Sequence, residues 1–159
     1  MNKKHLFYRP FKVLLMLLIV VSCSSSDDSN MLMYEEKSMD TEILELLNQY
    51  RSSKGLSVLL ELDIIKTQTH AHTAYMISKA KISHDNFSDR NAYLQKNANA
   101  KGVSENVASG YNTAQSVVNG WLNSEGHRKN IEGNYTHFNV SSKQNASNKW
   151  YYTNIFIKQ

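Results

Sequence analysis

The chain has 159 residues, of which 20% are charged, and a formal net charge of +4 at pH 7. The whole positive excess lies in residues 1–12, which hold four lysines and arginines and no acidic residue, so the remaining chain has 14 basic and 14 acidic residues. A balanced body without a basic stripe argues against a nucleic-acid-binding protein. We therefore expect no nucleic-acid partner.

The N-terminus has the pattern of an export signal. After the basic segment comes an unbroken apolar run, Val13–Val21, whose 9 residues are too few to span a bilayer, which needs about 20. The run ends in Val20-Val21-Ser22-Cys23, which resembles a bacterial lipoprotein signal, and this resemblance implies cleavage before Cys23 and attachment of lipid to it. Cys23 is the only cysteine, so it cannot form an internal disulfide.

The N-terminal pattern predicts three segments and a location. We expect a lipoprotein signal peptide at 1–22, the lipidated Cys23 with a polar tether at 23–40, and one folded domain at 41–159. The lipid on Cys23 would then anchor an exported protein to the bacterial cell envelope, at the outer membrane or cell surface. The alternative is a chance cysteine after an ordinary signal peptide or an N-terminal anchor helix.

Four helices are predicted in the body of the chain. Between residues 41 and 55, apolar residues recur at helical spacing, and Gly55 can end the helix. Similar patterns predict helices from Leu62 to about residue 81, from Asp89 to about residue 100, and over 113–123. Residues 138–140 alternate weakly and 150–157 are rich in β-branched and aromatic residues, which predicts two strands joined by a turn at 144–148. Helices followed by strands predict an α+β domain with an antiparallel sheet.

Several short motifs stand in a distinctive order along this body. They are Leu47-Asn48-x-x-Arg51, Ser83-His84-Asp85, Glu105-Asn106, Trp121-x-x-Ser124-x-Gly126-His127-Arg128-x-Asn130-Ile131 and Tyr152-Thr153-Asn154-Ile155-Phe156. This order resembles the CAP superfamily (cysteine-rich secretory, antigen 5 and pathogenesis-related 1 proteins) in its bacterial branch. The resemblance implies an α-β-α sandwich, with a small antiparallel sheet between helices.

The same resemblance implies a central cleft with a His-Glu-Glu-His tetrad. His84, Glu105 and His127 match three of its members. Many relatives place the fourth, a glutamate, where this chain has Ser124; Glu125 is the candidate substitute, although one residue on a helix turns a side chain by about 100°. Imidazole and carboxylate groups suit a divalent cation such as zinc. We therefore predict His84 and His127 as metal ligands and Glu105 as the candidate catalytic residue.

Structural roles compete with these assignments. His84 could cap a helix end, His127 could bind helix C-terminal carbonyls, and Glu105 could accept hydrogen bonds from a loop. In the His70-x-His72 pair the two side chains point to different helix faces, which predicts a packed His72 and a solvated His70.

Roles are also predicted for three polar residues near the motifs and for one strand that departs from the family pattern. Asn106 and Asn130 are expected to lock loops, and Arg90 to pair with a local acid. Bacterial relatives usually show a Gly-Val-Gly-like strand where this chain has Asn139-Val140-Ser141. This difference predicts an altered cleft wall or a ligand that is held less closely.

Three functions remain open at this stage. The first is an envelope binding module whose cleft holds a divalent cation and a lipid, glycan or peptide ligand. The second is a hydrolase in which a bound metal or Glu105 activates water. The third is a structural or adhesive surface protein with an inert cleft. The sequence contains no recognised nucleophile or metalloprotease motif, which favours a protein that is not an enzyme.

Overall fold

The computed structural model describes residues 37–159, which fall within the compact unit Glu35–Gln159. The predicted signal peptide, Cys23 and most of the tether lie outside the described residues. The elements are α1 (Met39–Ser53), β1 (Leu60–Glu61), α2 (Asp63–Ser78), α3 (Phe87–Ala98), β2 (Gly102–Ser109), α4 (Ala114–Asn123), α5 (Glu125–Ile131), β3 (His137–Gln144) and β4 (Trp150–Lys158). None of the described helices is both long and apolar enough to cross a membrane.

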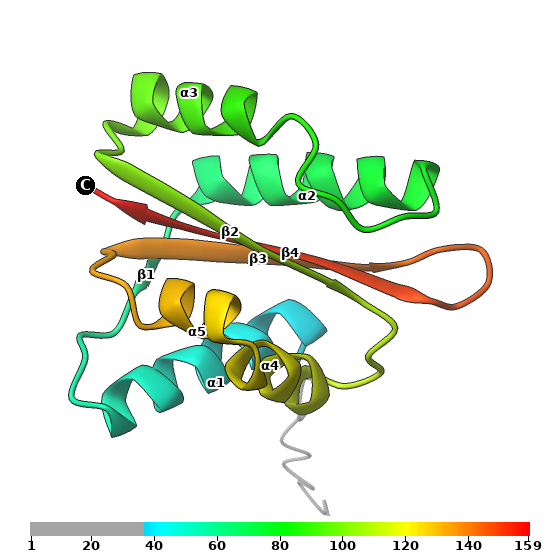
Figure 1. Ribbon diagram of the computed structural model, residues 1–159, viewed down its shortest axis with the longest axis horizontal. Helices are drawn as coiled ribbons and strands as arrows, with labels where there is room; N and C mark the ends of the chain where they lie inside the picture. Colours follow the sequence, from blue (N-terminus) through cyan, green and yellow to red (C-terminus); the bar gives the residue numbers. More distant parts are fainter. Residues whose placement is uncertain (1–36) are drawn as a thin grey trace, which may run out of the picture. The chain divides into compact units, whose positions relative to one another are not determined.

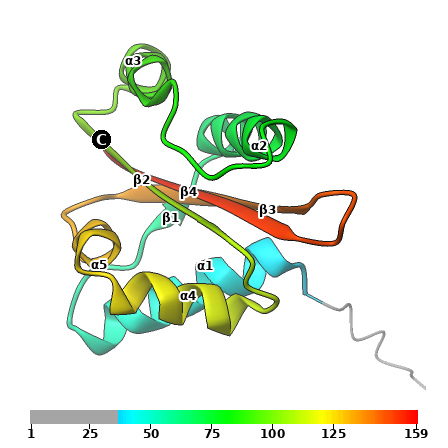
Figure 2. The same ribbon diagram turned by 45° about the vertical axis from the view of Figure 1, so that its right-hand side comes forward.

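The compact unit has three layers, with the sheet in the middle (Figure 1). Helices α2 and α3 cover one face of the sheet, and α1, α4 and α5 cover the other, as Figure 2 also shows. The larger apolar cluster joins α1, α4 and α5 to the sheet around Trp121, Tyr152 and Phe156. A smaller cluster joins α2 and α3 to the opposite face around Ile65, Leu94 and Ile155. The unit thus contains its own core.

The sheet has the strand order β1-β3-β4-β2. Strands β2 and β3 both pair antiparallel with the central β4, whereas the two-residue β1 pairs parallel with β3. The predicted α+β sandwich is confirmed, but the sheet is mixed, not purely antiparallel. The reason is connectivity: four helices and β2 separate β1 from β3 along the chain, so no hairpin dictates the direction of β1.

Local chemistry explains where several helices begin and end. The Ser38 side chain accepts the Thr41 N–H at the start of α1, and Thr113 and Ser116 form a capping box at the start of α4. Asn86 and Asn99, both with positive φ, flank α3. Helix α3 therefore begins at Phe87, two residues before the predicted start.

Two elements near the site were not predicted from the sequence, strand β2 and the short helix α5. Strand β2 forms one edge of the sheet, and its side chains alternate between the two helical layers. Glu105 faces α2 and α3, whereas the next residue, Asn106, faces α5. The edge of β2 is therefore where both layers can contribute side chains to one cleft.

Candidate functional site

The centre of the site is the carboxylate of Glu105, whose side chain is only 1% exposed. Arg90, from α3, binds both of its oxygens: Nε lies 2.8 Å from Oε2 and Nη2 lies 2.9 Å from Oε1. His84, from the loop between α2 and α3, places Nδ1 2.8 Å from Oε1. A buried carboxylate needs such partners, because an unpaired buried charge is strongly unfavourable.

This arrangement orients the His84 ring. An ionised carboxylate only accepts hydrogen bonds, so Nδ1 of His84 carries the proton and donates it to Glu105. The opposite nitrogen, Nε2, then lies at the outer end of a side chain that is 53% exposed. Nε2 has no partner among residues 37–159, so it is available to an external group. A carboxylate that orients an imidazole in this way is a common support for a metal ligand.

The loop that carries His84 is held by His72 of α2. The buried His72 donates from Nε2 to the Ser83 carbonyl at 2.7 Å, and the same nitrogen lies 3.8 Å from Oε1 of Glu105. Burial lowers the pKa of His72, and the nearby Glu105 carboxylate opposes this effect only in part. His72 is therefore packed, as expected, and it also fixes the residue that precedes His84. Its neighbour His70 is exposed, with Nε2 4.0 Å from Asp40.

His127 approaches the same edge of β2 from the opposite helical layer. It lies in α5, and its backbone carbonyl accepts a hydrogen bond from Asn106 Nδ2 at 3.1 Å. Asn130 of α5 donates to Asn106 Oδ1 at 2.8 Å and to the Glu105 carbonyl at 3.3 Å. Burial, and secondarily the charge of the neighbouring His84, lowers the pKa of His127. The two asparagines thus hold α5, and with it His127, against the strand that carries Glu105.

Two hollows lie along this strand. One has a volume of about 270 Å³ and contains His84, Glu105, Asn130 and Ser104, whose buried hydroxyl has no partner within the described residues. The other, also about 270 Å³, contains His127 beside apolar side chains that include Ile82 and Trp121. The structure therefore gathers His84, Glu105 and His127 along one strand edge, where each of the two hollows has both polar and apolar lining residues.

Glu125 is not part of this group. Its side chain is 73% exposed and pairs with Lys129 at 2.9 Å, one turn along α5. Ser124, the residue before it, lines the hollow that contains His127. Ser124 has an extended backbone and precedes α5, whereas Glu125 is the first residue of the helix, so the two side chains lie in different environments.

The expectation of an altered cleft wall at Asn139-Val140-Ser141 does not fit the structure. These residues lie within β3, all are buried, and none lines the two hollows beside the histidines. Sequence reasoning also missed the partner of Arg90. Its acid is Glu105, 15 residues away, and the sequence holds no signal for that pairing apart from the opposite charges.

The geometry limits the ways in which a metal could bind. No group of three or more histidine, cysteine, aspartate or glutamate side chains is placed to hold a metal ion in the part of the chain that the structure describes. Both oxygens of Glu105 are already engaged by Arg90 and His84. The imidazoles of His84 and His127 are thus the donors available here, and a cation between them would take its remaining ligands from water or a bound molecule.

Comparison with known proteins decides the family. The sequence profile of the cysteine-rich secretory protein (CAP) family matches residues 44–156, which is well over half of the chain. The chain belongs to the CAP family. Among curated CAP relatives, the uncharacterized protein YkwD of Bacillus subtilis is 31% identical over 118 residues, which cover 72% of this chain and 44% of YkwD. The uncharacterized membrane protein YlbC of the same organism is 31% identical over 133 residues, covering 78% of this chain and 36% of YlbC. The chain spans less than half the length of these relatives.

Solved structures show the same CAP fold. An extracellular protein containing an SCP domain from Bacillus anthracis superposes with a TM-score of 0.66 at 29% identity, covering 76% of this chain and 40% of that one. An outer surface protein of Borrelia burgdorferi gives a TM-score of 0.68 at 17% identity, covering 77% of this chain and 96% of that one. At 17% identity the second likeness speaks for the fold alone.

Proposed function

We propose that this protein is an exported, lipid-anchored binding module of the bacterial envelope, whose cleft holds a divalent cation between His84 and His127. The observation that carries the proposal is the Nδ1–Oε1 contact of 2.8 Å between His84 and the Arg90-bound Glu105, which leaves Nε2 at the exposed end of the ring. The lipid anchor on Cys23 rests on the N-terminal sequence. An envelope location accords with the description of the similar Bacillus anthracis protein as extracellular.

A binding role accounts for the arrangement better than hydrolysis does. A general base must be free to take a proton, and both oxygens of Glu105 are already engaged by Arg90 and His84. Glu105 acts here as a positioning residue for His84. His127, whose lowered pKa keeps its ring neutral near pH 7, supplies the second uncharged imidazole that a cation such as zinc requires.

The two hollows indicate the kind of ligand that would complete the site. The hollow at His84 is also lined by Phe87 and Val103, and the hollow at His127 is also lined by Ile82 and Trp121, so each combines an imidazole with an apolar wall. A molecule with one anionic or polar group and one apolar group would fill both. Part of an envelope lipid, glycan or peptide has this chemistry.

Zinc titration by calorimetry tests the proposal. The sample is the chain from Ser24 onward, which contains the whole compact unit, beside the His84→Ala/His127→Ala double variant and a His70→Ala control. We expect micromolar binding in the wild type and the control and none in the double variant, with matching circular dichroism for all three. Zinc binding that survives in the double variant, or is absent from the wild type, would contradict the cation site and favour an inert polar cleft.

A further inference from the structure

The edge of the sheet opposite the histidine cleft carries exposed apolar side chains. Val58 and Leu60, at strand β1 and just before it, are 53% and 61% exposed. We call these two residues the ridge. The ridge separates two hollows, because both of its residues line each of them. Large apolar side chains next to such hollows are typical of a surface that another molecule covers.

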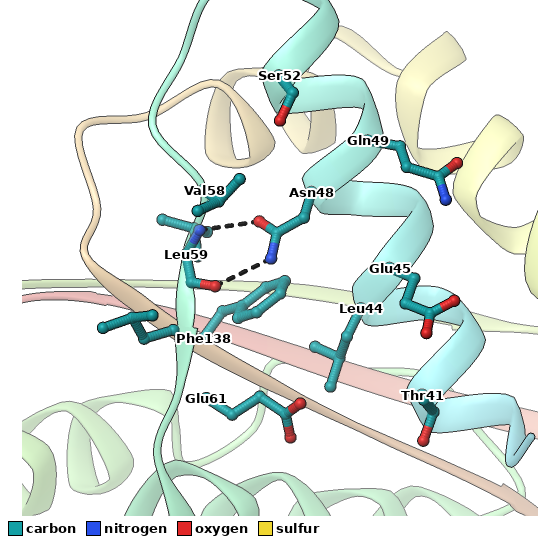
Figure 3. Close-up of a pocket in the computed structure, with 11 residues that line it drawn as sticks. Thr41, Leu44, Glu45, Asn48, Gln49, Ser52, Val58, Leu59, Glu61 and Phe138 are labelled. Atoms are coloured by element: carbon teal, nitrogen blue, oxygen red, sulfur yellow. Dashed lines mark hydrogen bonds between the residues drawn. The ribbon is translucent and has the colours of Figure 1, made fainter.

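The first hollow, the acidic groove, lies between the ridge and α1 and has a volume of about 710 Å³ (Figure 3). Its floor is apolar, since Leu44, Leu59 and Phe138 line it and are each at most 5% exposed. Glu45 and Glu61 supply its carboxylates, and Glu45 pairs with Lys37 of the same chain at 2.7 Å. Among residues 37–159, no lysine or arginine lines the groove itself. An apolar side chain that carries a nearby cation fits this groove.

The main chain beside the groove is closed by Asn48. Its side chain donates to the Leu59 carbonyl at 2.9 Å and accepts the Leu59 N–H at 2.8 Å, as the dashed lines in Figure 3 show. An asparagine amide thus takes the place of a further strand. A partner cannot add a strand to the sheet at the position of Leu59 without displacing Asn48, so contact here must be made through side chains.

The second hollow, the basic groove, lies on the other side of the ridge and has a volume of about 660 Å³. Lys158 lines it, and within residues 37–159 its ammonium donates only to the amide oxygen of Asn134. Arg51 is also present but buried, with its donors directed at backbone carbonyls. Glu132 is engaged by the hydroxyl of Tyr50 at 2.6 Å. Lys158 is thus the cation that an acidic partner can reach.

We propose that a second copy of this chain covers this surface, with the ridge of each copy in the acidic groove of the other. Across the surface of one copy, the order is α1, acidic groove, ridge and basic groove. A twofold axis parallel to the ridge places the same features of the second copy opposite them in the reverse order. When each ridge enters the opposite acidic groove, α1 of each copy comes to lie over the basic groove of the other. Glu45 of one copy then faces Lys158 of its mate, twice in the dimer.

The surface favours its own copy because it is complementary to itself in both shape and charge. One exposed apolar ridge lies beside one apolar groove. Glu61 and the Lys37-paired Glu45 lie on one side of the ridge, and Lys158, Arg51 and the Tyr50-bound Glu132 lie on the other, so the two sides differ in net charge. The contact uses the β1 edge, so both histidine clefts, at the β2 edge, remain open in the dimer. Cation binding and dimer formation are therefore separate properties.

Sedimentation equilibrium of the chain from Ser24 onward tests the dimer. We expect a concentration-dependent dimer in the wild type and a loss of about 100-fold or more in affinity for Leu60→Lys, because each dimer contains two ridges. Leu60 is largely exposed, so the substitution should leave circular dichroism unchanged. The matched control is Tyr93→Lys, which adds the same charge at a residue 42% exposed on α3.

A charge exchange tests the orientation of the two copies. Glu45→Lys and Lys158→Glu should each weaken the dimer by about 5- to 10-fold, and the two changes in one chain should restore most of the affinity. A wild-type monomer at every concentration would overturn the proposal and leave the groove to a different partner. A dimer that persists in Leu60→Lys, or that the paired charge exchange fails to restore, would also overturn it.

Discussion

The two edges of the sheet are closed by different chemistry. At β2, a buried network of charged side chains surrounds Glu105, and the adjoining carbonyls of Glu105 and Val107 accept from Asn130 and Trp121, both at 3.3 Å. At β1, one neutral amide, Asn48, binds both polar groups of Leu59. The charged network fixes an exposed imidazole but makes that edge sensitive to protonation. The neutral closure uses no titratable group and leaves apolar side chains at the surface.

The largest difference between the edges should appear when one partner of the buried ion pair is removed. Arg90→Met leaves the Glu105 carboxylate without its bidentate partner at a side chain 1% exposed, so we expect a loss of about 3–5 kcal/mol in the free energy of unfolding. Urea unfolding measures it. The double variant Arg90→Met/Glu105→Leu should recover much of that loss. A single variant that loses less than about 1 kcal/mol would show that the pair does not hold this edge together.

The neutral edge should respond less strongly. Asn48→Ala removes two hydrogen bonds and leaves the N–H and carbonyl of Leu59 unpaired, for an expected loss of about 1–3 kcal/mol in urea unfolding. Gln49→Ala, at the exposed neighbouring position of α1, is the matched control and should change stability by less than about 0.5 kcal/mol. Equal effects of the two changes would mean that Asn48 does not seal the edge.

Acid should weaken the β2 edge first. The pKa of His72 and of His127 is below 6.5 in the folded protein, so unfolding takes up protons at these residues. Their contribution to stability is complete above pH 6.5 and is lost as the pH falls from there toward the folded pKa values. Asp40, whose pKa burial raises, acts in the opposite direction at lower pH. Urea midpoints between pH 7.5 and 5 should show the decline, and His72→Gln should reduce it; an unchanged slope would exclude His72 as its source.

The smallest effect is expected at Glu125. Its pair with Lys129 is almost fully solvated, and such pairs contribute about 0–0.5 kcal/mol. Glu125→Ala should therefore leave both the stability and the zinc affinity unchanged. A clear loss of zinc binding in calorimetry would mean that Glu125 reaches the cation despite its position on the surface.

Periodicity was sufficient to predict the larger helices, because each buries an apolar face of ordinary spacing. The last strand was predicted from its β-branched and aromatic residues, and it is buried on both faces. Strand β2 escaped prediction because its middle is polar on both faces: Glu105 meets Arg90 in one layer, and Asn106 meets Asn130 in the other. Helix α5 has only 7 residues, too few to show a period. Strand β1 has two.

The site was predicted from the order of motifs and not from physical pattern alone. His84, Glu105 and His127 lie more than 20 residues apart, and only the fold, with both helical layers meeting at β2, brings them to one edge. The Arg90–Glu105 pair and the support of Ser83 by His72 depend on how α2 and α3 pack, which side-chain spacing does not reveal. Glu125 shows most clearly what the motif order could not predict. Ser124 lines the hollow that contains His127, whereas the next side chain along the chain, Glu125, is exposed to solvent.

Helix α1 makes hydrogen bonds both beside the β1 edge of the sheet and at the end of α5, the helix that carries His127. Asn48 fixes the helix to Leu59 at the β1 edge, and Arg51, about one turn further along, binds the carbonyls of Ile131 and Gly133 at the end of α5. Helix α5 in turn carries His127. Helix α1 therefore links Leu59, the residue just before β1, to the helix that carries His127. A change of helical register in α1 would displace both at once.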